Sequence, residues 1–252
     1  MEILFYIIGG LLAGIATGLV GLSAATIIAP LFATMLGMDP YTAIGIALAS
    51  DVLASATSAV TYYKNKNVDL KSGLLMGTSV ILFTILASYL SSFSNPITLN
   101  TTINFFVLFL GIRFIVYPVR NRSENKTKKI EKWIIPQTIF WGAVIGMISG
   151  FFGSGGGLSM LAVLTMLLGY NLKKGVGTSV FIMAAVAFVG ATTHIVISGS
   201  SLLPLIITSI SALIGANISS RQANKVNEII LNRVIGIFLI IYGIFLIIVY
   251  FI

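Results

Sequence analysis

The sequence is poor in the residues that most enzyme sites need. It has no cysteine, one histidine and seven acidic residues among 252 positions. The lack of cysteine excludes disulfides and thiolate-bound metals. One histidine and so few acids leave no catalytic triad, metal cluster or nucleotide-binding loop. We therefore predict that the chain is not an enzyme and that it holds no metal or cofactor.

Charge is also scarce. Charged residues make up 9% of the chain and hydrophobic residues 57%, whereas about 25% of the residues in an ordinary soluble domain are charged. So few charges cannot cover a soluble surface, and the apolar residues must also face lipid. The formal net charge of +8 comes from Lys and Arg between apolar runs, where they orient membrane helices. It does not indicate nucleic-acid binding. We predict an all-α membrane protein.

Ten apolar runs divide the chain into two halves of five. They cover 3–22, 24–37, 41–62, 71–92 and 99–118, and then 134–152, 156–169, 175–197, 202–219 and 229–251. We predict a first repeat over 1–118, a basic cytoplasmic linker over 119–132 and a second repeat over 133–252. The runs 24–37 and 156–169 are short for a full span, which is typical of re-entrant or broken helices. Each half then has about four full transmembrane helices plus one short helix.

A glycine pattern recurs between the halves, and the two glycines of every pair lie 132 positions apart in the sequence. The pairs are Gly10 and Gly142, Gly14 and Gly146, Gly18 and Gly150, Gly21 and Gly153, Gly37 and Gly169, Gly45 and Gly177, and Gly111 and Gly243. Asn100 and Asn232 keep this offset, which is here called the repeat offset. Its constancy indicates an internal repeat. The alternative is that membrane helices are simply rich in glycine.

The odd number of segments in each half predicts that the second repeat is inverted relative to the first. If the linker is cytoplasmic, this arrangement puts all 15 basic residues on the cytoplasmic side, as the positive-inside rule requires. With four spans per half, five basic residues would lie outside, namely Lys173, Lys174, Arg221, Lys225 and Arg233. We therefore predict a multi-pass plasma-membrane protein with a retained first helix and both termini outside.

The richest local signal is a glycine-rich break between the first two segments of the second half. It comprises Gly153, Ser154, Gly155, Gly156 and Gly157. Glycines allow a sharp turn and leave backbone N–H groups open. The helix that follows presents unpaired N–H groups and a positive dipole end, which suit an anion. Broken helices near the midplane of inverted repeats commonly hold substrates. The alternative is close helix packing through small residues.

The first half has a corresponding break with small residues in place of the glycine triplet. It comprises Gly21, Ser23, Ala24, Ala25 and Thr26. The hydroxyls of Ser23 and Thr26 can bind a ligand or cap the following helix. In the second half, Thr178 and Ser179 are expected to open the next helix and can reach the same cavity. Their alternatives are a helix cap or a bond between helices.

Two ionisable residues stand out inside the apolar runs, Asp51 and His194. A carboxyl group inside the membrane is costly and is therefore a functional candidate. Asp51 can carry a coupling proton, or donate to an anion in its acid form. It can also be a structural group that is bonded to neighbouring hydroxyls. The lone His194 cannot make a metal site, and we expect it to be structural or interfacial.

Several short motifs occur together. The chain reads GFFGSGGGLSM over 150–160, LGY over 168–170 and GVGTS over 175–179. The first half carries Gly14, Gly18, Gly21 and Pro30, with NVDLKSG over 67–73. Together they resemble the TauE/SafE family of sulfite exporters over nearly the whole chain. The first half departs from the pattern at 23–25 and at 45–47, so its site is expected to be weaker or tuned to another ligand.

The resemblance implies a secondary transporter, usually an exporter, of small sulfur-containing anions such as sulfite or organosulfonates. The residues alone reach only a small anion held near the midplane, with proton coupling through Asp51 as an option. A passive small-anion channel and a non-transporting membrane subunit are the alternatives. The predicted partners are a small anionic substrate and the lipid bilayer. The sequence does not determine the oligomeric state.

Overall fold

The computed structural model describes residues 2–91, 109, 111–117, 119, 131–152, 156–198 and 202–251. The regular elements among them are all helical, as predicted. They are α1 (Glu2–Val20), α2 (Ala25–Met35), α3 (Pro40–Lys64), α4 (Leu70–Ser91), α6 (Glu131–Phe152), α7 (Gly157–Ala162), the π-helix η1 (Val163–Leu167), α8 (Leu172–Ser198), α9 (Leu202–Lys225) and α10 (Glu228–Phe251). Residues 111–116 form a further helical segment.

Six of the described helices are long and apolar enough to cross a membrane: α1, α3, α4, α8, α9 and α10. They expose large aliphatic side chains such as Leu82, Ile206 and Ile241, as helices that face lipid do. The sequence predicted eight full spans. Most of the run 99–118 lies outside the described residues. In the 22-residue helix α6 the side chains are described only over 135–149, a stretch too short to count as a span.

The two short helices lie where the sequence predicted them. Helix α2 covers 25–35, and α7 with η1 covers 157–167, so their first and last residues are both related by the repeat offset. Each short helix is followed by a glycine with positive φ, Gly37 at 61° and Gly169 at 73°, a conformation that glycine adopts without strain. Helix α2 folds back along α1. The ring of Tyr6, near the start of α1, therefore meets the ring of Phe32, near the end of α2, edge to face at 5.3 Å.

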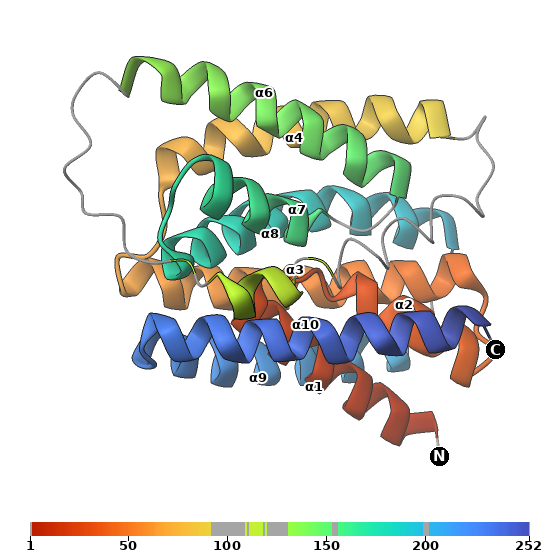
Figure 1. The fold of residues 1–252 in the computed structure, drawn as a ribbon. Coiled ribbons are helices and arrows are strands. Elements are labelled where there is room, and N and C mark those ends of the chain that lie inside the picture. Colours follow the sequence, from red (N-terminus) through yellow and green to blue (C-terminus); the bar gives the residue numbers. More distant parts are fainter. Residues whose placement is uncertain are drawn as a thin grey trace.

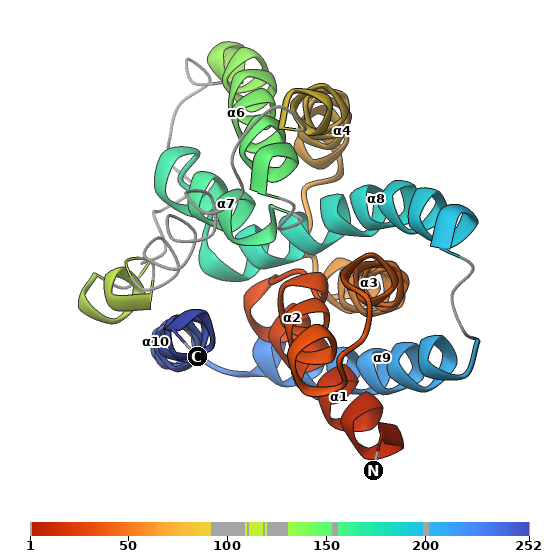
Figure 2. The ribbon, with the colours of Figure 1, turned by 90° about the vertical axis from the view of Figure 1, so that its right-hand side faces the viewer.

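Helices α3 and α8 lie in the middle of the bundle, with α1 and α9 packed on one side and α4 and α6 on the other (Figures 1 and 2). Small residues let α1 and α9 approach closely. A Cβ atom at Gly10 would lie 2.5 Å from the carbonyl oxygen of Thr208. One at Gly14 would overlap the carbonyl oxygen of Ala212. Because the contacts advance along α1 and α9 together, the two helices run in the same direction.

The contact between α4 and α6 repeats this arrangement with the two halves exchanged. A Cβ atom at Gly142 would lie 3.0 Å from the carbonyl oxygen of Met76, and one at Gly146 would lie 2.6 Å from that of Val80. Each glycine follows its counterpart in α1 by the repeat offset, and each partner precedes its counterpart in α9 by the same offset.

Helices α3 and α8 occupy equivalent places in the two halves and run in opposite directions. A Cβ atom at Gly190 would lie 3.2 Å from the Leu48 side chain, and one at Gly177 would lie 2.8 Å from Cβ of Tyr62. As α3 advances from 48 to 62, α8 therefore runs back from 190 to 177. The two equivalent helices are therefore antiparallel, which is the direction that an inverted second half requires.

One end of the bundle, here called the basic end, gathers positive charge. Its described residues include Lys64, Lys66, Lys71, Lys173, Lys174, Arg221 and Lys225. The loops there are bonded to one another. Nζ of Lys173 donates to the carbonyl oxygen of Asn224 at 2.8 Å, and Nδ2 of Asn67 donates to Oδ1 of Asn224 at 2.7 Å. Figure 1 shows the start of α1 and the end of α10 at the opposite end.

Candidate functional site

The two helix breaks meet at the centre of the bundle. A Cβ atom at Gly157 would overlap the carbonyl oxygen of Gly21 and Sδ of Met183, and would lie 3.2 Å from the backbone nitrogen of Ser23. A Cβ atom at Gly21 would lie 2.5 Å from Oγ of Ser179. Four predicted site residues from both halves are thus in direct contact. The same contacts pack the centre closely, so there is no room for a side chain at Gly157.

Asp51 lies at the first break, about halfway along α3. Its side chain is buried, with a residue exposure of 1%. Oδ2 accepts a hydrogen bond from Oγ of Ser23 at 2.5 Å, and Oδ1 accepts one from Oγ of Ser55 at 2.9 Å. The backbone of Ala24 also hydrogen-bonds to this carboxyl group. The carboxyl group of Asp51 therefore lies next to the start of α2, where the sequence predicted a bound anion.

Ser23 and Thr26 also make local hydrogen bonds within the first break. Oγ of Ser23 accepts a hydrogen bond from the backbone nitrogen of Ala25 at 3.3 Å, and Oγ1 of Thr26 donates to the carbonyl oxygen of Ser23 at 2.6 Å. Ala24 and Ala25 are buried. Ser23 thus accepts from the first backbone N–H of α2, whereas the hydroxyl of Thr26 donates to a carbonyl oxygen and caps no N–H group.

The second break differs from the first in chemistry. Gly156 precedes α7 with φ of 68°, and a Cβ atom there would overlap Oγ of Ser149. Ser149 is 2% exposed, and its hydroxyl has no hydrogen-bond partner among the described residues. The position related to Asp51 by the repeat offset is Met183. The described part of this break therefore presents a buried, unpartnered hydroxyl and no carboxyl group of its own.

Three of the predicted residues of this break, Gly153, Ser154 and Gly155, lie outside the described residues. The sequence analysis did not single out Ser149. The signal available was its place one turn before Gly153, on the helix that leads into the break. Its counterpart in the first half is Thr17, whose hydroxyl donates to the carbonyl oxygen of Ala13 at 2.9 Å. The two equivalent hydroxyls thus differ in whether they are satisfied.

The sequence predicted that Thr178 and Ser179 begin a helix, but both residues lie inside α8. Helix α8 begins at Leu172. Oδ1 of Asn171 accepts a hydrogen bond from the backbone nitrogen of Lys174 at 2.9 Å. The helix starts earlier because this side chain caps it. Oγ of Ser179 donates to the carbonyl oxygen of Val176 at 2.8 Å. Ser179 lies at the breaks, beside Gly21.

Thr178 belongs instead to a cluster at the basic end. Its Oγ1 accepts a hydrogen bond from the backbone nitrogen of Asp69 at 3.1 Å. The Asp69 carboxyl group accepts hydrogen bonds from Oη of Tyr170 at 2.9 Å and from the backbone nitrogen of Ser72 at 3.1 Å. Nζ of Lys174 lies 3.9 Å away. Burial raises the pKa of Asp69, but these bonds and the lysine outweigh it and hold the pKa below the ordinary 3.8.

Among the described residues, no three His, Cys, Asp or Glu side chains are close enough to hold a metal ion. His194 lies in α8, but its side chain is outside the described part of the chain. Its structural or interfacial role therefore stays a prediction.

The sequence is similar to a family of membrane proteins over almost its full length. The profile described as Sulfite exporter TauE/SafE matches residues 6–246. The chain is 27% identical over 220 residues to the Probable membrane transporter protein YunE of Bacillus subtilis, which covers 78% of this chain and 79% of that protein. It is 22% identical over 227 residues to the Probable membrane transporter protein YdhB of the same organism, covering 89% and 91%. A probable membrane transporter protein of Methanocaldococcus jannaschii is 26% identical over 196 residues, covering 75% and 71%.

Proposed function

The chain belongs to the sulfite exporter TauE/SafE family, and from this premise we propose that it is a secondary transporter that exports small sulfur-containing anions, such as sulfite or organosulfonates. The relatives are named as membrane transporters, and six described helices can span a membrane. The observation that carries the proposal is the meeting of two helix breaks at the centre of the bundle, where one break holds its own carboxyl group and the other holds a hydroxyl without a described partner.

The two halves are proposed to be inverted repeats. Two features support this relation. The glycine contacts of α1 with α9 recur between α6 and α4 with the halves exchanged, as a twofold axis requires. The equivalent helices α3 and α8 are antiparallel, so that axis lies in the membrane plane. Transporters of this design bind substrate at the interface of the repeats and alternate access by moving one against the other.

The substrate is proposed to bind at the second break. Backbone N–H groups of the glycines, with the hydroxyls of Ser149 and Ser179, would surround the anion. The described part of this break has no acid to repel it. The break is closely packed in the present arrangement, because Gly157 touches Gly21 across the interface. Substrate is therefore proposed to enter when the two breaks move apart.

Asp51 is proposed to couple transport to protons. Ser23 lies between the two sites, since its hydroxyl donates to Asp51 and its backbone nitrogen lies beside Gly157. An ionised Asp51 would repel a bound anion, whereas a protonated Asp51 would not. Anion binding and protonation then favour each other, and by linkage the effect is reciprocal. The carboxyl group is buried and bonded to two hydroxyls, so a proton there is held in a defined place.

The basic end is proposed to face the cytoplasm, with both termini outside, in a plasma membrane. The convergence of basic side chains from three connecting loops supports this orientation. The start of α1 and the end of α10 lie at the other end (Figure 1).

The proposal is tested by flux in proteoliposomes that are loaded in turn with sulfite, thiosulfate, sulfate and a small sulfonate. Wild-type protein should move at least one of the sulfur anions with saturable kinetics. Ser149→Ala should lower kcat/KM about 5- to 50-fold, the effect of removing one hydrogen bond to a charged ligand. The matched control is Thr17→Val at the equivalent position, where the hydroxyl is bonded within its own helix. It should leave flux unchanged.

Movement of none of these anions would overturn the substrate class. Flux that does not saturate and cannot drive one anion against its gradient would identify a passive channel instead. Equal losses in Ser149→Ala and Thr17→Val would show that the second break is not the binding site. The helical circular dichroism of both variants should match the wild type.

A further inference from the structure

A polar cavity of about 560 Å³ opens between α3 and α9 at the basic end. Its lining includes two cations, Lys64 of α3 and Arg221 of α9, together with the polar side chains of Thr57, Thr61 and Asn217. These residues follow helical spacing, since residues four apart lie on one face of a helix. No acidic residue lines the cavity.

The two positive charges have no counter-ion within the described chain. The ion pair found there joins Lys174 to Asp69, and neither Lys64 nor Arg221 takes part in one. Both side chains are exposed. Two cations that face one cavity at a helix end, beside hydroxyl and amide donors, provide the recognition chemistry for a phosphate group.

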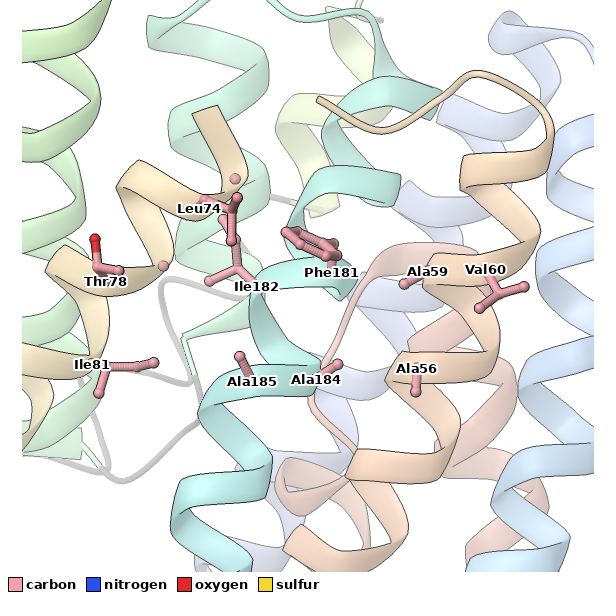
Figure 3. Close-up of a pocket in the computed structure, with 12 residues that line it drawn as sticks. Ala56, Ala59, Val60, Leu74, Thr78, Ile81, Phe181, Ile182, Ala184 and Ala185 are labelled. Atoms are coloured by element: carbon pink, nitrogen blue, oxygen red, sulfur yellow. The ribbon is translucent and has the colours of Figure 1, made fainter. Parts of the chain in front are cut away.

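A second cavity of about 420 Å³ adjoins the first at α3. Figure 3 shows the residues that line this second cavity. The two share Ala56 and Val60 in their linings. The second is bounded by α3, α4 and α8 and is lined almost wholly by apolar side chains, including Leu74, Ile81 and Phe181. It lies within the apolar length of these helices, where lipid chains pack. A polar, cationic cavity thus continues into an apolar groove.

We propose that these two cavities together bind one anionic phospholipid. Its phosphate lies between Lys64 and Arg221, and an acyl chain crosses Ala56 and Val60 into the groove between α3, α4 and α8. The cation pair selects a negatively charged headgroup. The apolar groove selects a lipid over free phosphate, because free phosphate gains nothing from a groove that is almost wholly apolar. This site is separate from the helix breaks and does not depend on what the protein transports.

The test compares lipid retention by native mass spectrometry of the purified full-length protein. The probes are phosphatidylglycerol, which is anionic, and phosphatidylcholine, which has no net charge. Wild-type protein should retain one phosphatidylglycerol in preference to phosphatidylcholine. The Lys64→Gln, Arg221→Gln double variant should lose this retention by about tenfold or more, since each basic residue near the membrane surface contributes about 1 kcal/mol to attraction of an anionic lipid.

The matched control is Lys66→Gln, Lys225→Gln, which removes two charges from the same end without touching the cavity lining. It should retain phosphatidylglycerol like the wild type. Ala185→Trp tests the groove, because Ala185 lines it and is exposed, so a larger side chain fills the groove without disturbing the core. It should lower phosphatidylglycerol retention about fivefold or more and leave the headgroup residues intact.

Three outcomes would overturn the proposal. One is an equal loss in the two double variants, which would reduce the effect to general charge. Another is unchanged retention in Ala185→Trp, with inorganic phosphate displacing the lipid, which would identify a site for free phosphate. The third is no preference of the wild type for the anionic lipid.

Discussion

Asp51 links the first helix break to the spanning helix α3 through hydrogen bonds. Its carboxyl group accepts a hydrogen bond from Ser23, which precedes α2, and one from Ser55 on its own helix. A buried carboxyl group with two hydroxyl donors is well held. It lies at the first break, bonded to the Ser23 that meets Gly157 of the second break, which is where the proposed coupling proton would be carried. The two roles that the sequence left open are therefore compatible, and only function separates them.

Asp51→Asn should separate them. The amide oxygen can still accept a bond from a serine, but the side chain no longer carries a titratable proton. We expect flux to stop responding to an imposed pH gradient, while movement of the anion down its own gradient stays within about threefold of the wild type. The control is Asp69→Asn, which removes an acid outside the membrane and should keep the pH response. A normal pH response in Asp51→Asn would leave Asp51 a structural group.

Asp69 gives a prediction for stability against pH. Its pKa in the folded protein lies below 3.8, so folding favours the ionised form. The stabilisation is present above that ordinary value and is lost as the pH falls through the lower pKa of the folded state. Asp69→Asn should therefore lower the free energy of unfolding by about 1–2 kcal/mol near neutral pH.

The measurement is unfolding in detergent at about pH 7 and about pH 3. The gap between wild type and Asp69→Asn should narrow at the lower pH. Tyr170→Phe and the double variant complete a cycle, because Oη of Tyr170 donates to this carboxyl group. A gap that is the same at both pH values would show that the charge of Asp69 contributes nothing.

At the scale of elements, closely packed glycine faces join one helix of each half to a helix of the other. Helix α1 meets α9 and α6 meets α4 through backbone atoms, so these pairs depend on residues without side chains. The short helices α2 and α7 can then reach the centre from either side. The glycines on the faces of α1 and α6 therefore serve close helix packing, whereas Gly156 forms a turn with positive φ.

Gly14→Ala and Gly77→Ala should differ sharply in stability. A Cβ atom at Gly14 would overlap the carbonyl oxygen of Ala212, which is backbone and cannot move aside. We expect a loss of about 1–3 kcal/mol. A Cβ atom at Gly77 in α4 would lie 3.6 Å from its nearest neighbour on Ile182, an ordinary contact.

Because alanine favours helix over glycine, Gly77→Ala should be neutral or stabilising by up to about 1 kcal/mol. Thermal unfolding in detergent compares the two variants directly. Similar losses in both would mean that helix contacts through the glycine face of α1 are looser than the geometry implies.

For the whole molecule, the decisive property is orientation. Because the chain has no cysteine, single introduced cysteines report sidedness without background. Asn65→Cys and Gln222→Cys place a thiol at the basic end, and Tyr41→Cys and Leu202→Cys place one at the opposite end. All four positions are exposed.

A membrane-impermeant thiol reagent should label Tyr41→Cys and Leu202→Cys on intact cells, and Asn65→Cys and Gln222→Cys on inverted vesicles only. The positive-inside rule predicts this result. Labelling of the first-half and second-half positions of one end from different sides would refute the inverted repeat.

The sequence by itself determined the properties that depend on composition and local backbone chemistry. Scarce charge implies membrane helices, because a protein surface with so few charged side chains is too apolar to face water. The constant offset between paired glycines predicts two matching halves, and short apolar runs predict the short helices. The glycine-rich break can also be predicted from the sequence, since glycine adopts the positive φ of Gly156 without strain. The start of α8 was misplaced because the cap provided by Asn171 was overlooked.

Only the tertiary structure decided which of these features act together. Ser23 and Asp51 are far apart in the sequence, and Gly21 and Gly157 come from different halves. No local pattern brings such residues together. Their contacts follow from how the helices pack, which depends on many weak interactions over their whole length. The same physical reason placed Lys64 and Arg221 on one cavity and assigned Thr178 to the Asp69 cluster rather than to the breaks.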